Sequence, residues 1–147
     1  MKITDALLAE HGMFYALFDR LEELIDETDS VAALQMAMDL LAPVLVSHAK
    51  VEDELLFPRL ESRPQGGGPL GAMRSEHQQI DALFAGIHAI GDLDALRGRV
   101  QEMIDVAREH FQKEDEIVLP VAVETVKEDV LERLGQQWAR LRQVPVD

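Results

Sequence analysis

The sequence predicts an all-α protein, an up-down-up-down four-helix bundle with an additional C-terminal helix. Ala, Leu, Glu and Asp dominate the 147 residues and aromatic residues make up only 5% of them, a composition that favours helices over strands. Four segments carry inward-facing residues at alternating steps of four and three, the spacing of a helical seam. Short connections join the first segment to the second and the third to the fourth, which indicates antiparallel neighbours.

The helices are predicted in chain order between the residues that interrupt this spacing. Asp29-Ser30 and Gly91-Asp92 are cap and turn signals, with Asp92 as a helix N-cap, and 62–69 is the clearest loop. We expect five helical segments, which are 4–27, 30–60, 69–90, 93–119 and 121–141. The whole chain, 1–147, is predicted to be a single domain, with the bundle over about 4–120 and the C-terminal helix over about 121–141.

The four predicted seams contain polar residues where a bundle should be apolar. Their members are Leu7, His11, Phe14, Phe18, Leu21 and Ile25; Leu34, Met38, Leu41, Leu45, His48, Glu52 and Leu55; Met73, His77, Ile80, Phe84 and Ile87; and Leu96, Val100, Met103, Ala107, His110, Glu114 and Ile117. Four histidines and two glutamates therefore face the core. A buried carboxylate costs several kcal/mol unless it is paired or binds a metal.

An internal repeat relates these polar residues to one another. Glu10-His11 recurs 66 residues later as Glu76-His77, and a His-x3-Glu-Asp-Glu motif, followed by three apolar residues and Pro, begins at both His48 and His110, 62 residues apart. With a rise of 1.5 Å per residue, all six side chains fall in one layer of an antiparallel bundle. The two halves are expected to be related by a pseudo-two-fold axis.

The layer is predicted to be a metal site. Residues four apart share one helix face, so each His-x3-Glu points an imidazole and a carboxylate into one pocket. The candidate ligands are His11, His48, Glu52, His77, His110 and Glu114. This set has no sulfur and suits iron or manganese, with zinc or copper as other candidates. Six ligands with two-fold symmetry indicate two metals, which keep open positions for a small oxidant.

These motifs resemble the hemerythrin-like, or HHE cation-binding, domain in its bacterial form. The resemblance implies two iron ions with an oxo or hydroxo bridge, with Glu52 and Glu114 bridging them and the four histidines as terminal ligands. Manganese or zinc would be substitutes. This sequence differs from the oxygen-carrying members of the family, which have a further histidine where this chain has Met73. Their last carboxylate is an Asp in a His-x4-Asp spacing, and Asp115 would satisfy that spacing. Because Glu114 lies on the seam and repeats Glu52, we prefer it to Asp115.

The resemblance implies a non-haem diiron protein that binds or reacts with O2, peroxide or NO, in oxidative or nitrosative stress or in iron handling. The alternative is a non-catalytic carrier or sensor of O2 or iron that acts through a partner, and a third hypothesis is a purely structural bundle. No specific reaction is assigned, so whether the protein is an enzyme stays open.

Charge and composition limit the partners. The net charge of −14 opposes contact with nucleic acid and with anionic membranes. No apolar run was expected to reach the ~20 residues that span a bilayer. No signal peptide is apparent and cysteine is absent, so neither disulfides nor thiolate chemistry is expected and the default location is the cytoplasm.

Several residues stay open from sequence alone. Glu10 and Glu76 are either acceptors for imidazole N–H groups or solvated acids, and for Tyr15 packing is favoured over a hydrogen bond near the site. His88 is read as a surface residue. The apolar stripe of the tail either closes one flank of the bundle or forms a dimer interface, so the protein is a monomer or a homodimer; this stripe consists of Val123, Val126, Val130, Leu134 and Trp138.

Overall fold

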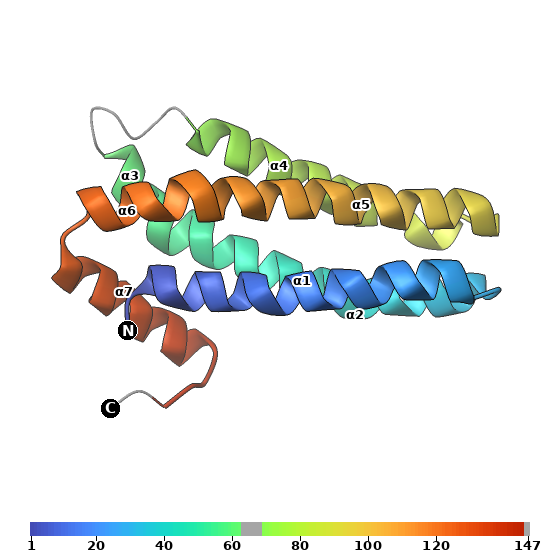
Figure 1. Ribbon diagram of the computed structural model, residues 1–147, viewed down its shortest axis with the longest axis horizontal. Coiled ribbons are helices and arrows are strands. Elements are labelled where there is room, and N and C mark those ends of the chain that lie inside the picture. The colour runs from blue at the N-terminus through green and yellow to red at the C-terminus, as the bar shows by residue number, and fades with distance from the viewer. Residues whose placement is uncertain (63–68, 146–147) are drawn as a thin grey trace.

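The computed structural model describes residues 1–62 and 69–145, and all regular structure in these residues is helical. Figure 1 shows the long helical segments lying along one another in a bundle, with the shorter C-terminal helix at the end where the chain begins. The elements are α1 (Ile3–Glu27), α2 (Val31–Val51), η1 (Glu52–Leu56), α3 (Phe57–Glu61), α4 (Leu70–Phe84), η2 (Ile87–Ala89), α5 (Leu93–Lys113), η3 (Glu114–Val118), α6 (Leu119–Thr125) and α7 (Glu128–Leu141). The predicted fold class is confirmed, whereas most of the predicted loop 62–69 lies outside the described residues.

The helix starts follow the predicted caps. The Ser30 hydroxyl accepts a hydrogen bond from the Ala33 N–H at 3.2 Å, and the Asp92 carboxylate accepts one from the Ala95 N–H at 2.8 Å. The third bundle helix ends earlier than expected, because α4 stops at Phe84 and Gly86 adopts a left-handed conformation with φ of 75°. Glycine reaches that conformation without steric cost and commonly ends a helix there.

The predicted boundary at Pro120 is wrong. The fourth helix continues through η3 and α6 to Thr125, and the chain turns at Val126 before α7. Pro120 lies in the first turn of α6, where a missing N–H is tolerated. Pro58 has the same place in α3.

Two π-helical turns shift the inward face of their helices. The sequence places Leu55 and Ile117 on the seam, but Leu55 is only half-buried and Ile117 is 49% exposed. Their neighbours Leu56 and Val118 are buried instead, at 0% and 2% exposure. A π turn contains one residue more than an α turn, so the glutamate that starts η1 or η3 faces inward and the next inward residue comes four positions later.

Two apolar clusters fill the bundle, one on each side of the polar layer. One contains Phe14, Leu45, Ile80 and Phe111, and the other contains Leu7, Val51, Met73 and Val118. Along α1, α2 and α4, one histidine lies between residues of the two clusters. The six polar residues therefore form a single buried layer, as predicted.

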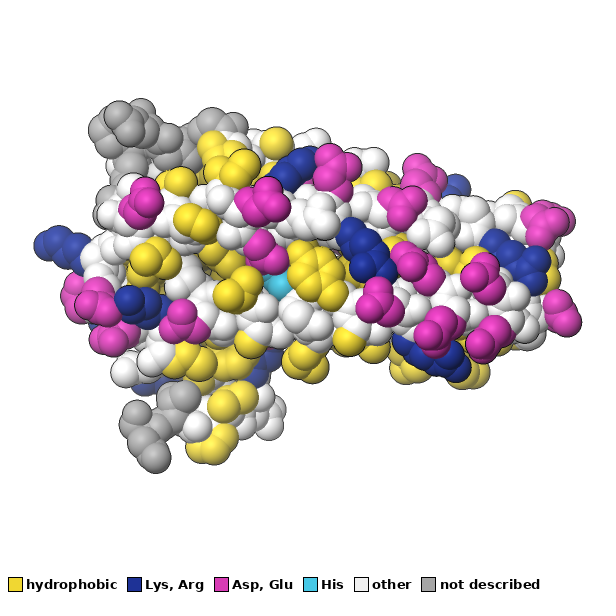
Figure 2. All heavy atoms as spheres, viewed as in Figure 1, with side chains coloured by type: hydrophobic (Ala, Val, Ile, Leu, Met, Phe, Trp, Pro, Cys, Tyr) yellow, Lys and Arg dark blue, Asp and Glu magenta, His cyan; other side chains and the backbone are white. Residues whose placement is uncertain are grey.

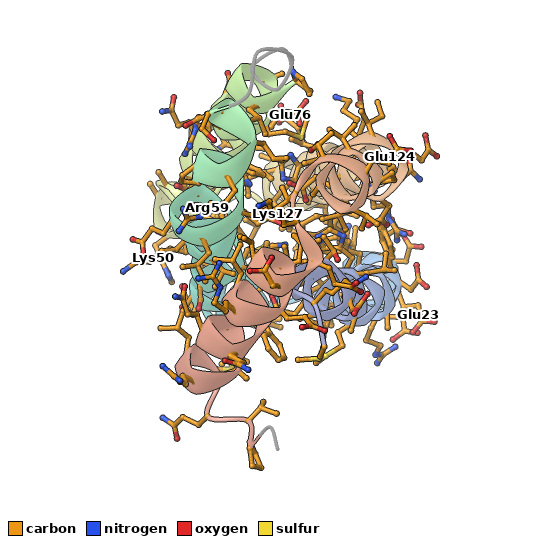
Figure 3. The ribbon with its side chains drawn as sticks, turned by 90° about the vertical axis from the view of Figure 1, so that its left-hand side faces the viewer. Glu23, Lys50, Arg59, Glu76, Glu124 and Lys127 are labelled. Carbon is orange, nitrogen blue, oxygen red and sulfur yellow. The ribbon has the colours of Figure 1, made fainter. Side chains whose placement is uncertain are left out.

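The C-terminal helix α7 closes one flank of the bundle. It packs against α1, and Figure 3 shows it lying across the bundle beside α1. Leu131 and Leu134 are buried in the same apolar cluster as Ile3 and Leu7. Gly135 permits this approach, because a Cβ atom there would overlap the carbonyl oxygen of Met1. Most of the predicted tail stripe is covered in this way, although Val123 is 50% exposed.

The surface is acidic with apolar patches between the charges (Figure 2). One patch follows the outer side of α2, where Met36, Leu40 and Val44 are at least half exposed. By length and composition the continuous stretch Val31–Glu61, in which an 18-residue window has a mean hydropathy of 1.5, could cross a membrane. The stretch meets these criteria by its average and not as an uninterrupted apolar run, because Gln35, Asp39 and Lys50 lie within it. The core helix of a soluble protein meets the same criteria.

Candidate metal centre

The structure brings all six predicted ligands together in one buried layer. Their relative exposures range from 0% for His11 to 7% for His77. The ligand atoms form two groups, each within 4.8 Å, and both groups share the two glutamates. We call His11 and His48 with the glutamates the first metal position, and His77 and His110 with the glutamates the second.

Within each position the two imidazoles direct their Nε2 atoms at a common point. Nε2 of His11 lies 3.0 Å from Nε2 of His48, and the same distance separates Nε2 of His77 from Nε2 of His110. Each Nδ1 atom faces a carboxylate and has the role of donor, so in the neutral tautomer both Nε2 atoms carry lone pairs. Two facing lone pairs repel unless a cation lies near both, which is the geometry of a metal site.

The two glutamates extend one oxygen towards each position. Glu52 lies 3.0 Å from His48 through Oε1 and 3.2 Å from His77 through Oε2. Glu114 lies 3.3 Å from His11 through Oε2 and 3.4 Å from His110 through Oε1. All four oxygens are buried without a hydrogen-bond partner. A buried carboxylate without partners is costly, so the residues present fit a pair of bridged cations.

Four carboxylates outside the layer orient the imidazoles. Nδ1 of His48 lies 2.6 Å from Glu10, and Nδ1 of His110 lies 2.8 Å from Glu76. Nδ1 of His11 lies 2.6 Å from Asp115, and Nδ1 of His77 lies 3.2 Å from Asp53. Each ligand histidine thus has a carboxylate that fixes its tautomer and ring orientation, as in many metal sites. We call these four residues the supporting carboxylates.

These contacts show where Glu114, Asp115 and Tyr15 lie relative to the other candidate ligands. Glu114 lies in the centre, whereas Asp115 lies beside it and holds His11. The Tyr15 hydroxyl donates to Asp115 at 3.0 Å while its ring packs edge-on against Phe111 at 6.2 Å. The sequence favoured packing alone for Tyr15, and the hydrogen bond corrects that interpretation. Burial and the contact with Asp115 raise the pKa of Tyr15, which therefore keeps its proton.

The other residues left open also have clear places. Glu10 and Glu76 accept from imidazoles on the neighbouring helix rather than from the histidines that follow them in sequence. His88 is exposed and contacts Asp39 at 2.8 Å, as expected for a surface residue. Asp53 was missed as a supporting residue, and only its place after Glu52, repeated by Asp115 after Glu114, could have indicated that role.

Charges around the metal-free centre favour protonated imidazoles at the first position. Burial lowers the pKa of His11, but the nearby carboxylates of Glu114 and Glu52 outweigh this effect and raise the pKa to about 10. Burial also lowers the pKa of His48. The negative charge of Glu52 and the hydrogen bond to Glu10 outweigh burial and raise this pKa to about 9. Burial and the negative charge of Glu52 raise the pKa of Glu114, so the two central carboxyls do not both ionise easily.

Metal affinity at this centre is expected to fall as the pH falls. The pKa values of His11 and His48, about 10 and about 9, lie above neutral pH. Each imidazole must therefore lose a proton to bind a cation, and the affinity for Fe²⁺ should drop about ten-fold or more for each pH unit between pH 8 and 6. Competition with a chelator under anaerobic conditions measures this. His88→Gln serves as the control that leaves the slope unchanged, and an affinity independent of pH would contradict the prediction.

A small cavity opens onto the layer between α2 and α4. Its volume is about 20 Å³, and it is lined by Leu45, His48, Ala49, His77, Ile80, Asp81, His110 and Phe111. A space of about 10–15 Å³ holds one water, so the cavity has room for a molecule of only a few atoms. The cavity lies where the two halves of the repeat differ, because Ala49 stands where the second half has the larger Phe111.

Comparison with known proteins agrees with this geometry. A family model described as "Hemerythrin HHE cation binding domain" matches residues 2–143. A protein of Nostoc sp. (strain PCC 7120) described as a DNA nickase is 24% identical over 140 residues, which cover 95% of this chain. The chain spans 37% of the length of that relative. No solved structure matches the sequence significantly.

Proposed function

Because this chain belongs to the hemerythrin HHE cation-binding family, we propose that its buried centre holds two iron ions and binds or reacts with O2, hydrogen peroxide or NO. The observation that carries the proposal is the pair of ligand groups that share Glu52 and Glu114. Neighbouring irons would supply one-electron redox chemistry and open coordination positions for a small oxidant.

The protein's own residues determine what reaches the centre and in which state. The supporting carboxylates keep the Nε2 lone pairs of the four histidines directed inward. The cavity beside Ala49 limits the ligand to a few atoms, which supports O2, NO and peroxide over an organic substrate. Tyr15 and Asp115 form a hydrogen-bonded chain from the half-buried edge of α1 to Nδ1 of His11, a route along which a proton can be held near the first position.

DNA cleavage is not part of this proposal. The Nostoc relative is described as a nickase, but this chain corresponds to only 37% of its length. The net charge of −14 also opposes contact with a phosphate backbone. We place the protein in the cytoplasm as a proposal, since its lack of cysteine fits a reducing compartment.

One preparation tests the proposal. The protein is purified without oxygen and loaded with Fe²⁺, and the metal per chain and the absorbance are measured before and after O2, NO or hydrogen peroxide is added. About two irons per chain and a new charge-transfer band with at least one oxidant are expected. Reversible oxygenation would identify a carrier or sensor, and steady peroxide consumption an enzyme. Failure to retain iron, or iron that responds to none of the three, would refute the proposal.

A cavity-filling variant tests whether the ligand enters beside α2. Ala49→Phe places at position 49 the residue that the repeat has at Phe111, and the larger side chain would fill the cavity. We therefore expect iron to be retained but the spectral change to slow by about ten-fold or more. Ala72→Phe, on the exposed side of α4, is the matched control and should react like the wild type. Equal rates in all three proteins would show that the ligand enters elsewhere.

A further inference from the structure

The two metal positions differ in the cation that holds one of their supporting carboxylates. At the second position Glu76 is held by Lys113, which lies 2.6 Å away and belongs to the same helix as His110. The repeat places Val51 where Lys113 would stand in the first half. Val51 is buried among apolar residues, so the first half does not supply a cation at this place.

The C-terminal segment supplies that cation. The Arg142 guanidinium donates to Glu10 at 2.7 Å, and the indole N–H of Trp138 donates to the same carboxylate oxygen at 2.8 Å. The other oxygen of Glu10 faces Nδ1 of His48 at 2.6 Å. Glu10 is thus held between a candidate ligand on α2 and two donors from the end of α7.

Arg142 also contacts the second helix that carries a ligand of this position. It donates to the Ser47 hydroxyl at 2.7 Å, and Ser47 immediately precedes His48 as Glu10 precedes His11. One side chain therefore joins α7 to α1 and α2 next to both histidines of the first position. The second position has no such contact with α7 among the described residues.

We propose that α7 is a structural part of the first metal position, through the positioning residues Arg142 and Trp138, and that metal occupancy of this position and docking of α7 are thermodynamically linked. This inference rests on the proposed metal centre. If docked α7 orients His48 and thereby strengthens metal binding, then bound metal must strengthen docking by the same factor. The docked state of α7 then reports the occupancy of one of the two positions at the protein surface.

Hydrogen exchange and metal titration test the linkage together. In the wild type, amide exchange over 128–141 should slow by about ten-fold or more when Fe²⁺ is added without oxygen. Arg142→Gln should weaken one of the two metal equivalents by about 10- to 100-fold and abolish the slowing of α7 exchange that metal causes in the wild type. Trp138→Phe, which keeps the ring packing and removes only the N–H, should give a smaller shift in the same direction.

Two further variants separate linkage from a local loss of structure. Gly135→Ala disturbs the contact of α7 with the Met1 backbone without touching Glu10, and should also weaken the first position. Lys113→Gln should weaken the other equivalent and leave α7 exchange unchanged. Arg140→Gln, exposed on the same helix as Trp138, should change neither.

The outcomes distinguish this inference from the proposed function. Two bound irons with identical α7 exchange in the metal-free and loaded protein would overturn the linkage while leaving the metal centre intact. Arg142→Gln that binds both equivalents like the wild type would do the same. A wild-type protein that binds no metal would overturn both.

Discussion

Glu114→Leu is expected to empty both metal positions and at the same time to stabilise the metal-free protein. Each proposed position would lose one carboxylate oxygen, which should weaken Fe²⁺ binding by more than about 100-fold, because loss of a group that only supports a ligand already costs about 10- to 100-fold. The carboxylate is 1% exposed and its oxygens have no hydrogen-bond partner. Replacing it with an apolar side chain of similar size should therefore raise the free energy of unfolding of the metal-free protein by about 1–3 kcal/mol.

Iron per chain and a urea titration of the metal-free protein measure the two effects. Asp115→Asn is the matched variant, because it changes the neighbouring acid that faces His11 instead of a central one. It should retain two irons at saturation and lose about 10- to 100-fold in affinity at the first position only. If Asp115→Asn emptied the centre and Glu114→Leu did not, the assignment of the last carboxylate would be reversed.

Phe111→Ala is expected to be the most destabilising single substitution next to the centre. Phe111 is 2% exposed, stacks on the His11 ring at 4.4 Å and on Phe14 at 5.3 Å, and lines the small cavity. Truncating a buried phenylalanine costs about 3–5 kcal/mol through lost burial and the space left behind. The enlarged cavity would also admit water to the first position, so iron should be released faster as well.

Phe18→Ala distinguishes the two consequences. Phe18 is 0% exposed and lies in the same apolar cluster, 6.1 Å from Phe111. It should cost a similar free energy of unfolding, measured in urea, without changing the rate at which a chelator removes iron. Equal iron release from both variants would mean that Phe111 protects the centre only through overall stability.

The bundle and the six central residues could be predicted because they depend on helical periodicity and on a repeated motif. Seam spacing places His11, His48, His77 and His110 on inward faces, and antiparallel neighbours bring them to one height. The helix end at Phe84 could be predicted less well, because Gly86 is one of several small residues near that end of the segment. The sequence also gave no periodic signal for the π turns, so Leu55 and Ile117 were placed one position away from the residues that are buried.

The surroundings of the centre could be predicted less well, because they depend on contacts between helices. Glu10 and Glu76 precede histidines, yet each faces the imidazole of a different helix. The contact of Arg142 with Glu10 joins residues 132 positions apart, and no local pattern indicates it. Only the comparison of Lys113 with Val51 across the repeat hints that a cation is missing from the first half.

The π turns also change what should be regarded as the transferable motif. In both halves the turn begins at the candidate glutamate ligand and passes into a helix whose first turn contains proline. If the same residues formed an uninterrupted α-helix, everything beyond the turn would be rotated by about 100°, so Phe57 and Leu60 would leave the core. A designer who grafts this centre onto another bundle should therefore carry the whole segment from His48 to Pro58, or from His110 to Pro120, and not the five-residue His-x3-Glu motif alone.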